Sequence, residues 1–194
     1  MVENEQFSGK NDIELVEMSL KDQDNFLYLI ERYEAKLLRY IRRITNIAKE
    51  DAEDLLQEVF LKVYLKLNDF DRDLKFSSWI YRITHNEVIS NHRKLKARPQ
   101  SVFLNPENDL INNLVADLDL EKSIEMSLLR DNIFKILDHL EIKYKEILIL
   151  KFLEDKNYRE ISDILKIPMG TVGTLINKGK EKFKEELARQ KIKL

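Results

Sequence analysis

The chain has 194 residues, of which 43% are hydrophobic and 35% are charged, and its formal net charge is −2. It contains no cysteine, which excludes disulfide frameworks and zinc sites built on thiolates. Because it has only four Gly, three Pro and almost no strand signals, we expect an all-α protein of two small helical domains. No apolar run approaches the roughly 20 residues that span a bilayer, and the acidic N-terminus lacks a signal-peptide pattern, so we expect a cytoplasmic protein.

Charge is unevenly distributed along the chain. The charged residues at 3–24 are mostly acidic, whereas those at 82–98 and 178–193 are mostly basic. A phosphate responds to charges within a Debye length of about 10 Å. A local basic face can therefore bind nucleic acid although the total charge is slightly negative.

The first predicted helix covers residues 25–47, after a polar segment at 1–11 that we expect to be frayed. Its apolar residues recur at helical spacing and define one face, namely Phe26, Leu29, Ile30, Tyr33, Leu37, Ile41 and Ile44. Arg39, Arg42 and Arg43 lie on the outer face, where solvated cations near a helix end interact favourably with the dipole.

A second helix is predicted to begin near Asp51. Its buried stripe consists of Leu56, Phe60, Val63, Tyr64 and Leu67. The acidic residues at its start favour the positive end of the helix dipole. We prefer this interpretation to a metal site or an acid–base pair, because no histidine lies nearby.

The third helix opens at residues 76–79, after a turn-rich loop at 68–75, and extends to Lys96. Trp79, Ile80, Ile83 and Val88 point to one side, and the other side carries Arg82, His85, Asn86, Ile89, Arg93 and Lys96. Basic residues beside aromatic rings are typical of a single-strand nucleic-acid site. The alternative is that Trp79 belongs to the core and that the charges are merely solvated.

Two histidines on this helix, His85 and His92, are seven residues apart and share a face. We expect both to face solvent or phosphate, because no third ligand is evident for a metal ion. The sequence therefore predicts no metal site here.

The helical pattern breaks around Pro99 and Pro106, which indicates a linker, and it resumes by Glu121. A further segment at 140–155 supplies apolar residues, including Ile142, Ile147, Leu150 and Phe152. We expect these helices to form the scaffold of the second domain. The linker is either an ordinary tether or an acidic segment that occupies a basic channel of a partner.

The segment 157–184 has the pattern of two short helices joined by a tight turn. Asn157 and Glu160 can form a capping box, and Pro168 marks the start of the second helix. Val172, Ile176, Gly179 and Phe183 share one face, whereas Thr174, Asn177, Lys178 and Glu181 lie on another. This predicts a helix-turn-helix whose second helix enters the major groove, although a hairpin inside a helical bundle has the same local pattern.

Two strings in the sequence resemble the extracytoplasmic-function (group IV) sigma factors of the sigma-70 family. FSSWIYRITHNEVISNHRK at 76–94 resembles the segment that melts and reads the minus-ten element, and the GTV and TLINKGK strings after the IP turn resemble the minus-thirty-five helix-turn-helix. The resemblance implies a region 2 domain at 12–96, a flexible linker at 97–120 and a region 4 domain at 121–190. It also implies binding to bacterial core RNA polymerase and promoter DNA, with an anti-sigma factor as a further candidate partner.

The resemblance assigns roles to three sets of residues. The set that would face core polymerase is Asp54, Leu55, Gln57, Glu58 and Leu61. The minus-ten set is Asp69, Lys75, Phe76, Trp79, Arg82, Asn86, Arg93 and Lys94, with Trp79 supporting the 68–75 loop from below. The minus-thirty-five set is Arg159, Thr171, Thr174, Asn177, Lys178 and Lys180.

Three positions depart from the family pattern at the expected reading site. Lys166 stands where the turn usually has Gly, and a lysine adopts a left-handed conformation only with strain. Gly173 and Leu175 replace residues that are usually basic, so two contacts to DNA are missing. We therefore expect an atypical upstream element.

The functional prediction is an RNA polymerase sigma factor rather than an enzyme, since no nucleophile–base pair, metal cluster or phosphate loop is evident. No cofactor is expected. The main alternative is a stand-alone helix-turn-helix regulator of duplex DNA. A weaker alternative is a helical adaptor that binds only protein.

Overall fold

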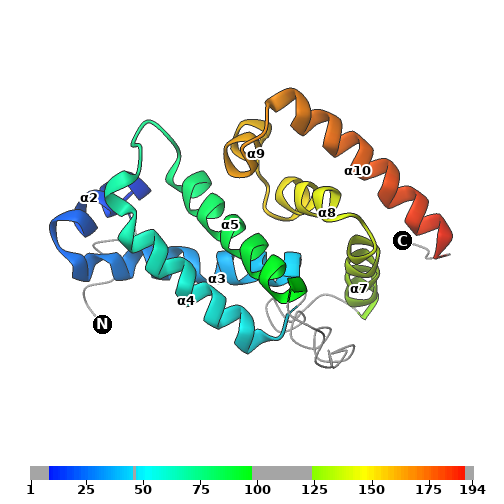
Figure 1. Ribbon diagram of the computed structural model, residues 1–194, viewed down its shortest axis with the longest axis horizontal. Helices are drawn as coiled ribbons and strands as arrows, with labels where there is room; N and C mark the ends of the chain where they lie inside the picture. Colours follow the sequence, from blue (N-terminus) through cyan, green and yellow to red (C-terminus); the bar gives the residue numbers. More distant parts are fainter. Residues whose placement is uncertain (1–8, 46, 98–123, 191–194) are drawn as a thin grey trace.

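The computed structural model describes residues 9–45, 47–97 and 124–190. All regular structure in these ranges is helical, which confirms the predicted fold class. An N-terminal group of helices, α2 to α5, and a C-terminal group, α7 to α10, lie side by side (Figure 1). The expected linker at 97–120 lies outside the described residues, apart from Ala97.

The N-terminal domain contains α2 (Asp12–Lys21), η1 (Gln23–Asn25), α3 (Phe26–Thr45), α4 (Lys49–Leu65), η2 (Leu67–Asp69) and α5 (Phe76–Ala97). The helices α3, α4 and α5 coincide closely with the three predicted ones, whereas α2 has no counterpart among the predictions. Asn11 caps α2 through a capping box with Glu14. This cap explains why the chain becomes helical directly after the segment expected to be frayed.

The core of the N-terminal domain lies where α2, α4 and α5 meet the buried face of α3. Its fully buried side chains include Leu15, Leu29, Leu37, Ile41, Phe76 and Ile80. Each such side chain stabilises the fold by about 1.5–3 kcal/mol relative to exposure. The helical spacing of the apolar residues in α3 therefore determines which side of this helix faces inward.

The C-terminal domain contains α7 (Ile124–Asp138), α8 (Ile142–Leu148), the π-helical turn η3 (Ile149–Leu153), α9 (Tyr158–Leu165) and α10 (Met169–Arg189). The turn η3 continues α8 directly, and the Glu154 amide donates to the Ile149 carbonyl oxygen at 3.0 Å, a spacing of five residues. Ile147 and Leu150 are buried beside Ile161 and Ile164 of α9, as the apolar pattern predicts. Ile142 and Phe152 are exceptions, because their side chains are 42% and 54% exposed.

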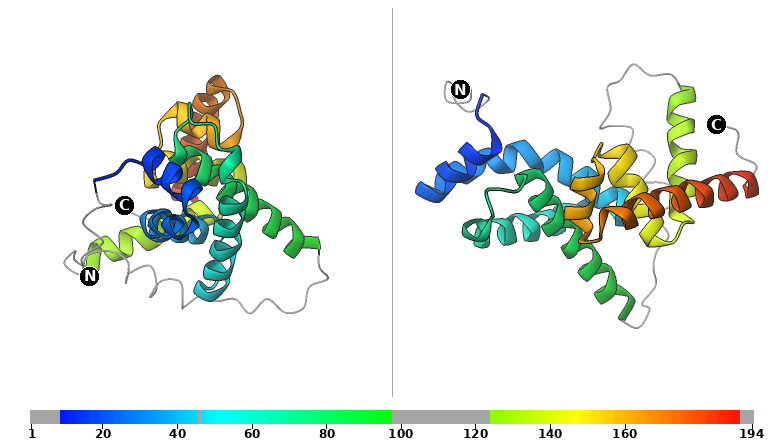
Figure 2. Two further views of the ribbon diagram at one scale, coloured as in Figure 1. Left: turned by 90° about the vertical axis from the view of Figure 1, so that its left-hand side faces the viewer. Right: turned by 90° about the horizontal axis from the view of Figure 1, so that it is seen from above.

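The two domains are packed against each other. Most of their buried apolar residues belong to one cluster, and α9 is the C-terminal helix that packs against α5. Figure 2 shows that the C-terminal half of α5 projects away from the rest of the molecule. The first half of α5 is therefore the part that lies between the two domains.

Candidate nucleic-acid interface

The first helix of the predicted helix-turn-helix is α9, and its start is fixed by the expected capping box. The Glu160 amide donates to Asn157 Oδ1 at 3.0 Å, and the Asn157 amide donates to Glu160 Oε2 at 2.9 Å. Ile161 and Ile164 then turn inward and are buried. Local sequence thus specifies both the start and the inward face of α9.

The turn between α9 and α10 is confined to residues 166–168. Lys166 adopts the left-handed conformation, with φ 55° and ψ 45°, which is the conformation that favours glycine. The Ser162 hydroxyl donates to the Ile167 carbonyl at 2.6 Å and holds the turn closed. Pro168 precedes the first residue of α10, as predicted.

The second helix, α10, presents one packed side and one exposed side. Val172, Ile176 and Gly179 are buried. The six residues of the predicted minus-thirty-five set are all exposed, namely Arg159 on α9 and Thr171, Thr174, Asn177, Lys178 and Lys180 on α10. A polar and cationic helix face next to a helix-turn-helix turn has the form of a surface that enters a major groove.

Gly179 allows α10 to approach α8 closely. A Cβ atom at this position would lie 3.2 Å from Leu148 Cγ and 3.4 Å from both Leu148 Cδ atoms. Gly173 differs, because a Cβ atom there would meet only Tyr158 Cε2, at 3.6 Å. The glycine at 179 therefore has a packing role, and the glycine at 173 does not.

The predicted minus-ten set divides into exposed polar residues and buried aromatic ones. Asp69, Lys75, Asn86, Arg93 and Lys94 are exposed, and Arg82 is half-buried. Phe76 and Trp79 are only 1% and 6% exposed, so the expectation that they contact DNA is wrong for this conformation. Burial of Trp79 agrees with the alternative that it belongs to the core.

The two buried rings support the loop at 68–75 from within. The Phe70 ring lies 5.3 Å from Phe76 and 5.3 Å from Trp79, measured between centroids. Phe70 is itself 6% exposed and is the ring of this aromatic group that belongs to the loop. The rings therefore position the loop, whose polar side chains Asp69 and Lys75 lie at the surface. Lys75 Nζ is paired with Glu160 Oε1 at 3.0 Å.

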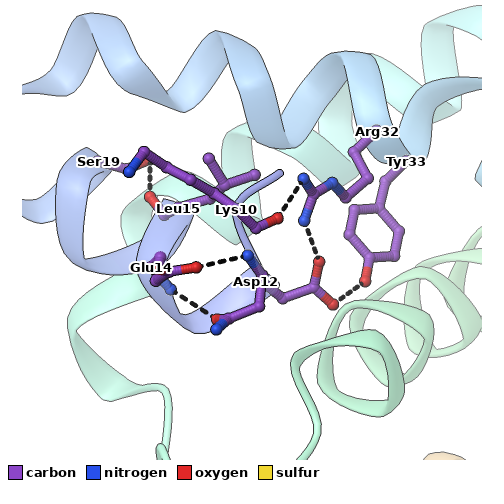
Figure 3. A network of polar contacts seen from close by, with 8 residues as sticks. Lys10, Asp12, Glu14, Leu15, Ser19, Arg32 and Tyr33 are labelled. Carbon is purple, nitrogen blue, oxygen red and sulfur yellow. Dashed lines mark hydrogen bonds and ion pairs between the residues drawn. The ribbon is translucent and has the colours of Figure 1, made fainter. Parts of the chain in front are cut away.

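The start of α2 lies beside the same loop, and sequence reasoning did not assign it a role. Asp12 accepts hydrogen bonds from Arg32 Nη1 at 2.9 Å and from the Tyr33 hydroxyl at 2.5 Å (Figure 3). Arg32 Nη2 also donates to the Lys10 carbonyl at 2.7 Å. These bonds fix the start of α2 on α3, next to the Tyr33 ring that packs edge-on against Phe76 at 5.5 Å.

A groove of about 620 Å³ separates the start of α2 from the loop. Residues 11–14 line one side, and residues 72–77 line the other.

The Asn-x-x-Glu pattern at 11–14 is the same capping signal as at 157–160 and could have revealed α2.

The predicted polymerase-binding residues lie on α4. Asp54, Gln57, Glu58 and Leu61 are exposed, and Leu61 is 59% exposed. Leu55 is only 2% exposed and packs in the core, so the expectation that it faces a partner is wrong for this conformation. The exposed α4 face, defined here as Asp54, Gln57, Glu58 and Leu61, is acidic with one large apolar side chain.

His85 does not face solvent or phosphate as expected. Its ring is half-buried, with Nδ1 at 3.2 Å from the Tyr40 hydroxyl oxygen. Burial lowers the pKa of His85 to about 4. The imidazole is therefore neutral at neutral pH and contributes no charge to a phosphate-binding face.

Neither a metal site nor a membrane span is found in the described residues. They contain no group of three or more His, Cys, Asp or Glu side chains that could hold a metal ion. None of the helices in the described ranges combines the length and the apolar character needed to cross a membrane.

Two family models match the chain. "Sigma-70 region 2" matches residues 29–98, and "Sigma-70, region 4" matches residues 130–183. The first match covers α3 to α5, and the second covers most of the C-terminal domain. The matched ranges thus contain the exposed α4 face, the whole minus-ten set and the helix-turn-helix.

Curated relatives and solved structures agree with these matches. The extracytoplasmic-function (ECF) RNA polymerase sigma factor SigW of Bacillus subtilis is 34% identical over 173 residues, covering 86% of this chain and 90% of that protein. The RNA polymerase sigma-H factor of Pseudomonas aeruginosa is 31% identical over 185 residues, covering 92% and 94%.

Two solved structures share the fold. CnrH, in complex with the cytosolic domain of CnrY, has a TM-score of 0.67 at 20% identity, covering 92% of this chain and 97% of that one. The sigma factor RpoE of Bartonella quintana, in complex with the anti-sigma factor NepR, has a TM-score of 0.63 at 19% identity, covering 84% and 97%. The family matches, together with the SigW and sigma-H relatives, show that the chain belongs to the sigma-70 family, as an RNA polymerase sigma factor of the extracytoplasmic-function group.

Proposed function

We propose that this sigma factor divides promoter recognition between its two domains, with the roles assigned to specific exposed residues. The exposed α4 face binds core RNA polymerase. The loop at 68–75 and α5 read the unpaired minus-ten element, and α10 reads the minus-thirty-five duplex. The observation that carries the proposal is that α10 buries Val172 and Ile176 while Thr174, Asn177 and Lys178 stay exposed.

Energetics support a specificity subunit that acts together with a larger enzyme. Opening about a dozen base pairs costs well over 10 kcal/mol, at roughly 1.4 kcal/mol per stacked step. Capture of one or two unstacked bases returns only a few kcal/mol. We therefore assign the chain no catalytic activity, and melting becomes a joint property of the complex with polymerase in the bacterial cytoplasm.

The test of polymerase binding uses two matched double variants. Asp54→Ala with Glu58→Ala removes two carboxylates from the exposed α4 face. Glu31→Ala with Glu34→Ala removes two exposed carboxylates from α3. We expect the first variant to bind core polymerase at least about tenfold more weakly and the second to bind normally, as measured by fluorescence anisotropy. Equal affinities would exclude the α4 face.

The test of duplex reading uses Asn177→Ala on α10. Loss of one good base contact changes discrimination by about 1–3 kcal/mol. We expect the variant to relax preference at one base of the upstream element while its affinity for polymerase is unchanged. Run-off transcription on a library of promoter fragments measures this, with Glu185→Ala near the end of α10 as the control.

Two rival functions make different predictions. A stand-alone regulator protects promoter DNA without polymerase, whereas a sigma factor requires polymerase for a footprint. A purely protein-binding adaptor is unaffected by loss of Asn86. We expect Asn86→Ala to retain polymerase binding and to lose promoter opening, which would exclude the adaptor.

A protein inhibitor is a further proposed partner. The related structures of CnrH and RpoE were each solved with a second protein, and the one bound to RpoE is an anti-sigma factor. We extend this to the present chain as a proposal. Co-purification with a bacterial protein that blocks polymerase binding would support it.

A further inference from the structure

A cavity of about 500 Å³ lies inside the C-terminal domain, between α7, α10 and the continuous segment formed by α8 and η3. Helix α10 packs against both α7 and α8, and Figure 1 shows these three helices grouped together. The apolar side chains that line the cavity are Ile133, Leu137, Leu148, Phe152, Leu153 and Phe183. We call it the α7–α10 cavity. Its volume falls in the range of roughly 300–1,000 Å³ that is usual for small-molecule sites.

The apolar lining combines buried and exposed side chains. Leu137 of α7 and Leu148 of α8 are only 3% and 5% exposed. Phe152 of the π-helical turn η3 is 54% exposed, although it lines the same cavity. Single π-helical turns inside α-helices recur at functional sites. A ligand that covers the Phe152 ring and fills the cavity therefore gains the free energy of apolar burial on several sides.

Two lysines of α10 complete the lining of the α7–α10 cavity. Lys180 and Lys184 are one helical turn apart, so they extend from the same side of α10. Lys180 Nζ lies 5.4 Å from the centroid of the Phe152 ring. Lys182 and Arg189 form ion pairs within α10, whereas neither Lys180 nor Lys184 does so in the part of the chain that the structure describes. The cavity thus has an apolar interior and an unpaired cationic edge.

This combination selects the chemistry of a ligand. A purely apolar molecule leaves both lysines without a counter-ion, and a small hydrophilic anion leaves the apolar lining in contact with water. An amphipathic protein helix requires an open groove several turns long. We propose that the α7–α10 cavity binds a fatty acid, with its hydrocarbon chain among the apolar side chains and its carboxylate at Lys180 and Lys184.

Binding has a consequence for DNA, because Lys180 also belongs to the minus-thirty-five set. A carboxylate at Lys180 neutralises a charge that otherwise attracts a DNA phosphate. The fatty acid therefore weakens the contact of α10 with the upstream duplex. This consequence rests on the proposed function, whereas binding of the fatty acid rests on the cavity and its lysines alone.

Isothermal titration calorimetry of the full-length chain with dodecanoate, below its critical micelle concentration, tests binding. We expect one molecule per chain. In the series decanoate, dodecanoate and tetradecanoate, affinity should rise about fourfold per added methylene, which corresponds to about 0.8 kcal/mol. Dodecyltrimethylammonium has the same hydrocarbon chain and the opposite charge, and it should bind at least about tenfold more weakly. Absence of dodecanoate binding, or equal affinity for the two head groups, overturns the proposal.

Two pairs of matched variants locate the site. Lys184→Gln should weaken dodecanoate binding about three- to tenfold, whereas Lys182→Gln, on the same helix but outside the lining, should leave it unchanged. Phe152→Glu places a carboxylate at the cavity and should weaken binding at least about tenfold. Tyr158→Glu changes another exposed ring, outside the cavity, and should have no effect.

All four replaced side chains are exposed, so we expect the variants to fold, and circular dichroism checks this. If Phe152→Glu is misfolded, the Lys184→Gln and Lys182→Gln pair alone decides. Equal affinities in folded members of a pair place the ligand elsewhere and overturn the proposal.

A bilayer is the other source of anionic hydrocarbon chains. Flotation with vesicles of phosphatidylglycerol separates the two sources. We expect any association with these vesicles to be the same in the parent and in Phe152→Glu, because the cavity accepts a free fatty acid. Vesicle binding that depends on Phe152, together with no binding of monomeric dodecanoate, overturns the proposal in favour of a membrane contact.

Run-off transcription with core polymerase tests the consequence for DNA. Dodecanoate should reduce the transcript several-fold in the parent and much less in Lys184→Gln, which controls for direct effects on polymerase. It should also reduce the salt dependence of promoter binding by about one phosphate contact, a slope of ~0.9. Calorimetric binding with unchanged transcription overturns the regulatory role. Failure of the chain to direct any transcription would overturn the proposed function and leave the measured binding intact.

Discussion

The hydroxyl oxygen of Tyr40 lies 3.2 Å from Nδ1 of His85, between α3 and α5. Tyr40 is fully buried, and its pKa is raised well above the ordinary value, first by burial and then by the nearby Glu146 and Glu154 carboxylates. The buried Tyr40 thus lies near both His85 and Glu146. Their protonation affects stability in opposite directions.

His85 should make the protein less stable in acid. Burial lowers its pKa from 6.5 to about 4, so the unfolded chain binds more protons between these values. This contribution is present above about pH 6.5 and is lost as pH falls toward 4, by roughly 3 kcal/mol at ~1.36 kcal/mol per unit. Urea unfolding at pH 7 and pH 4.5 should show that His85→Gln loses less free energy of unfolding in acid than the parent does. His139→Gln replaces an exposed histidine and should lose as much free energy of unfolding in acid as the parent.

Glu146 should have the opposite effect. Burial raises its pKa from 4.5 to about 7, so the folded chain binds more protons between these values. Its stabilising contribution is complete below about pH 4.5 and is lost as pH rises through 7, again by roughly 3 kcal/mol. Glu146→Gln should therefore be more stable than the parent at pH 8, measured by urea unfolding. An unchanged stability at pH 8 would contradict this, and Glu34→Gln on the surface of α3 is the matched control.

The two windows overlap between pH 4.5 and 6.5, where the opposing contributions nearly cancel in the parent chain. Replacing either side chain alone should reveal the pH dependence of the free energy of unfolding that the other side chain causes. In a His85→Gln/Glu146→Gln double variant, this pair should again contribute little pH dependence to the free energy of unfolding. Hydrogen–deuterium exchange across this pH range provides a second readout.

Lys166→Gly should stabilise the helix-turn-helix. Lys166 has a φ of 55°, and a residue with a Cβ atom in this region costs about 1–2 kcal/mol relative to glycine. Allowing for the greater flexibility of glycine in the unfolded chain, we expect a net gain of about 1 kcal/mol in the free energy of unfolding. Glu185→Gly, inside α10, should instead destabilise by about 1 kcal/mol.

Gly179→Ala and Gly173→Ala should differ in sign. At 179 the new Cβ would lie 3.2 Å from Leu148, whose side chain is only 5% exposed and cannot easily move. Overpacking should outweigh the gain in helix propensity and destabilise the protein by about 1 kcal/mol. At 173 the nearest atom is 3.6 Å away, so alanine should stabilise by about 0.5–1 kcal/mol. Thermal unfolding of the two variants distinguishes these outcomes.

Sequence predicts the helix-turn-helix well because its determinants are local. The capping pair Asn157 and Glu160, the apolar spacing on α9 and the position of Pro168 all act within a few residues. The same signal at Asn11 and Glu14 marks α2. The pattern there is less conspicuous because α2 has only ten residues.

Exposure at the candidate site is harder to predict from sequence. Leu55 and Leu56 are neighbours, yet both are buried, because α4 packs against other helices over a wider angle than a single stripe suggests. Phe76 begins a helix that resembles a DNA-reading segment, but the Phe70 and Trp79 rings enclose it. These outcomes depend on tertiary packing and not on periodicity.

Glu154 joins the two domains by accepting hydrogen bonds from Arg43 and Tyr81, and this contact has no signature in the sequence. Arg43, Tyr81 and Glu154 lie on three separate elements, and no spacing relates them. Arg43 in particular satisfies the pattern of a solvated residue at a helix end. Only the packing of the domains shows that Arg43 donates to the Glu154 carboxylate, 111 residues further along the chain.

The π-helical turn η3 gives the chain one residue more per turn immediately before Glu154. Deleting a single residue from Ile149–Leu153 would let the turn close with ordinary helical winding and leave the segments before and after it nearly in register. The Glu154 carboxylate would then keep its place opposite Arg43 and Tyr81. The π-helical turn is therefore a place where one codon can be gained or lost in evolution while the contact between the two halves persists.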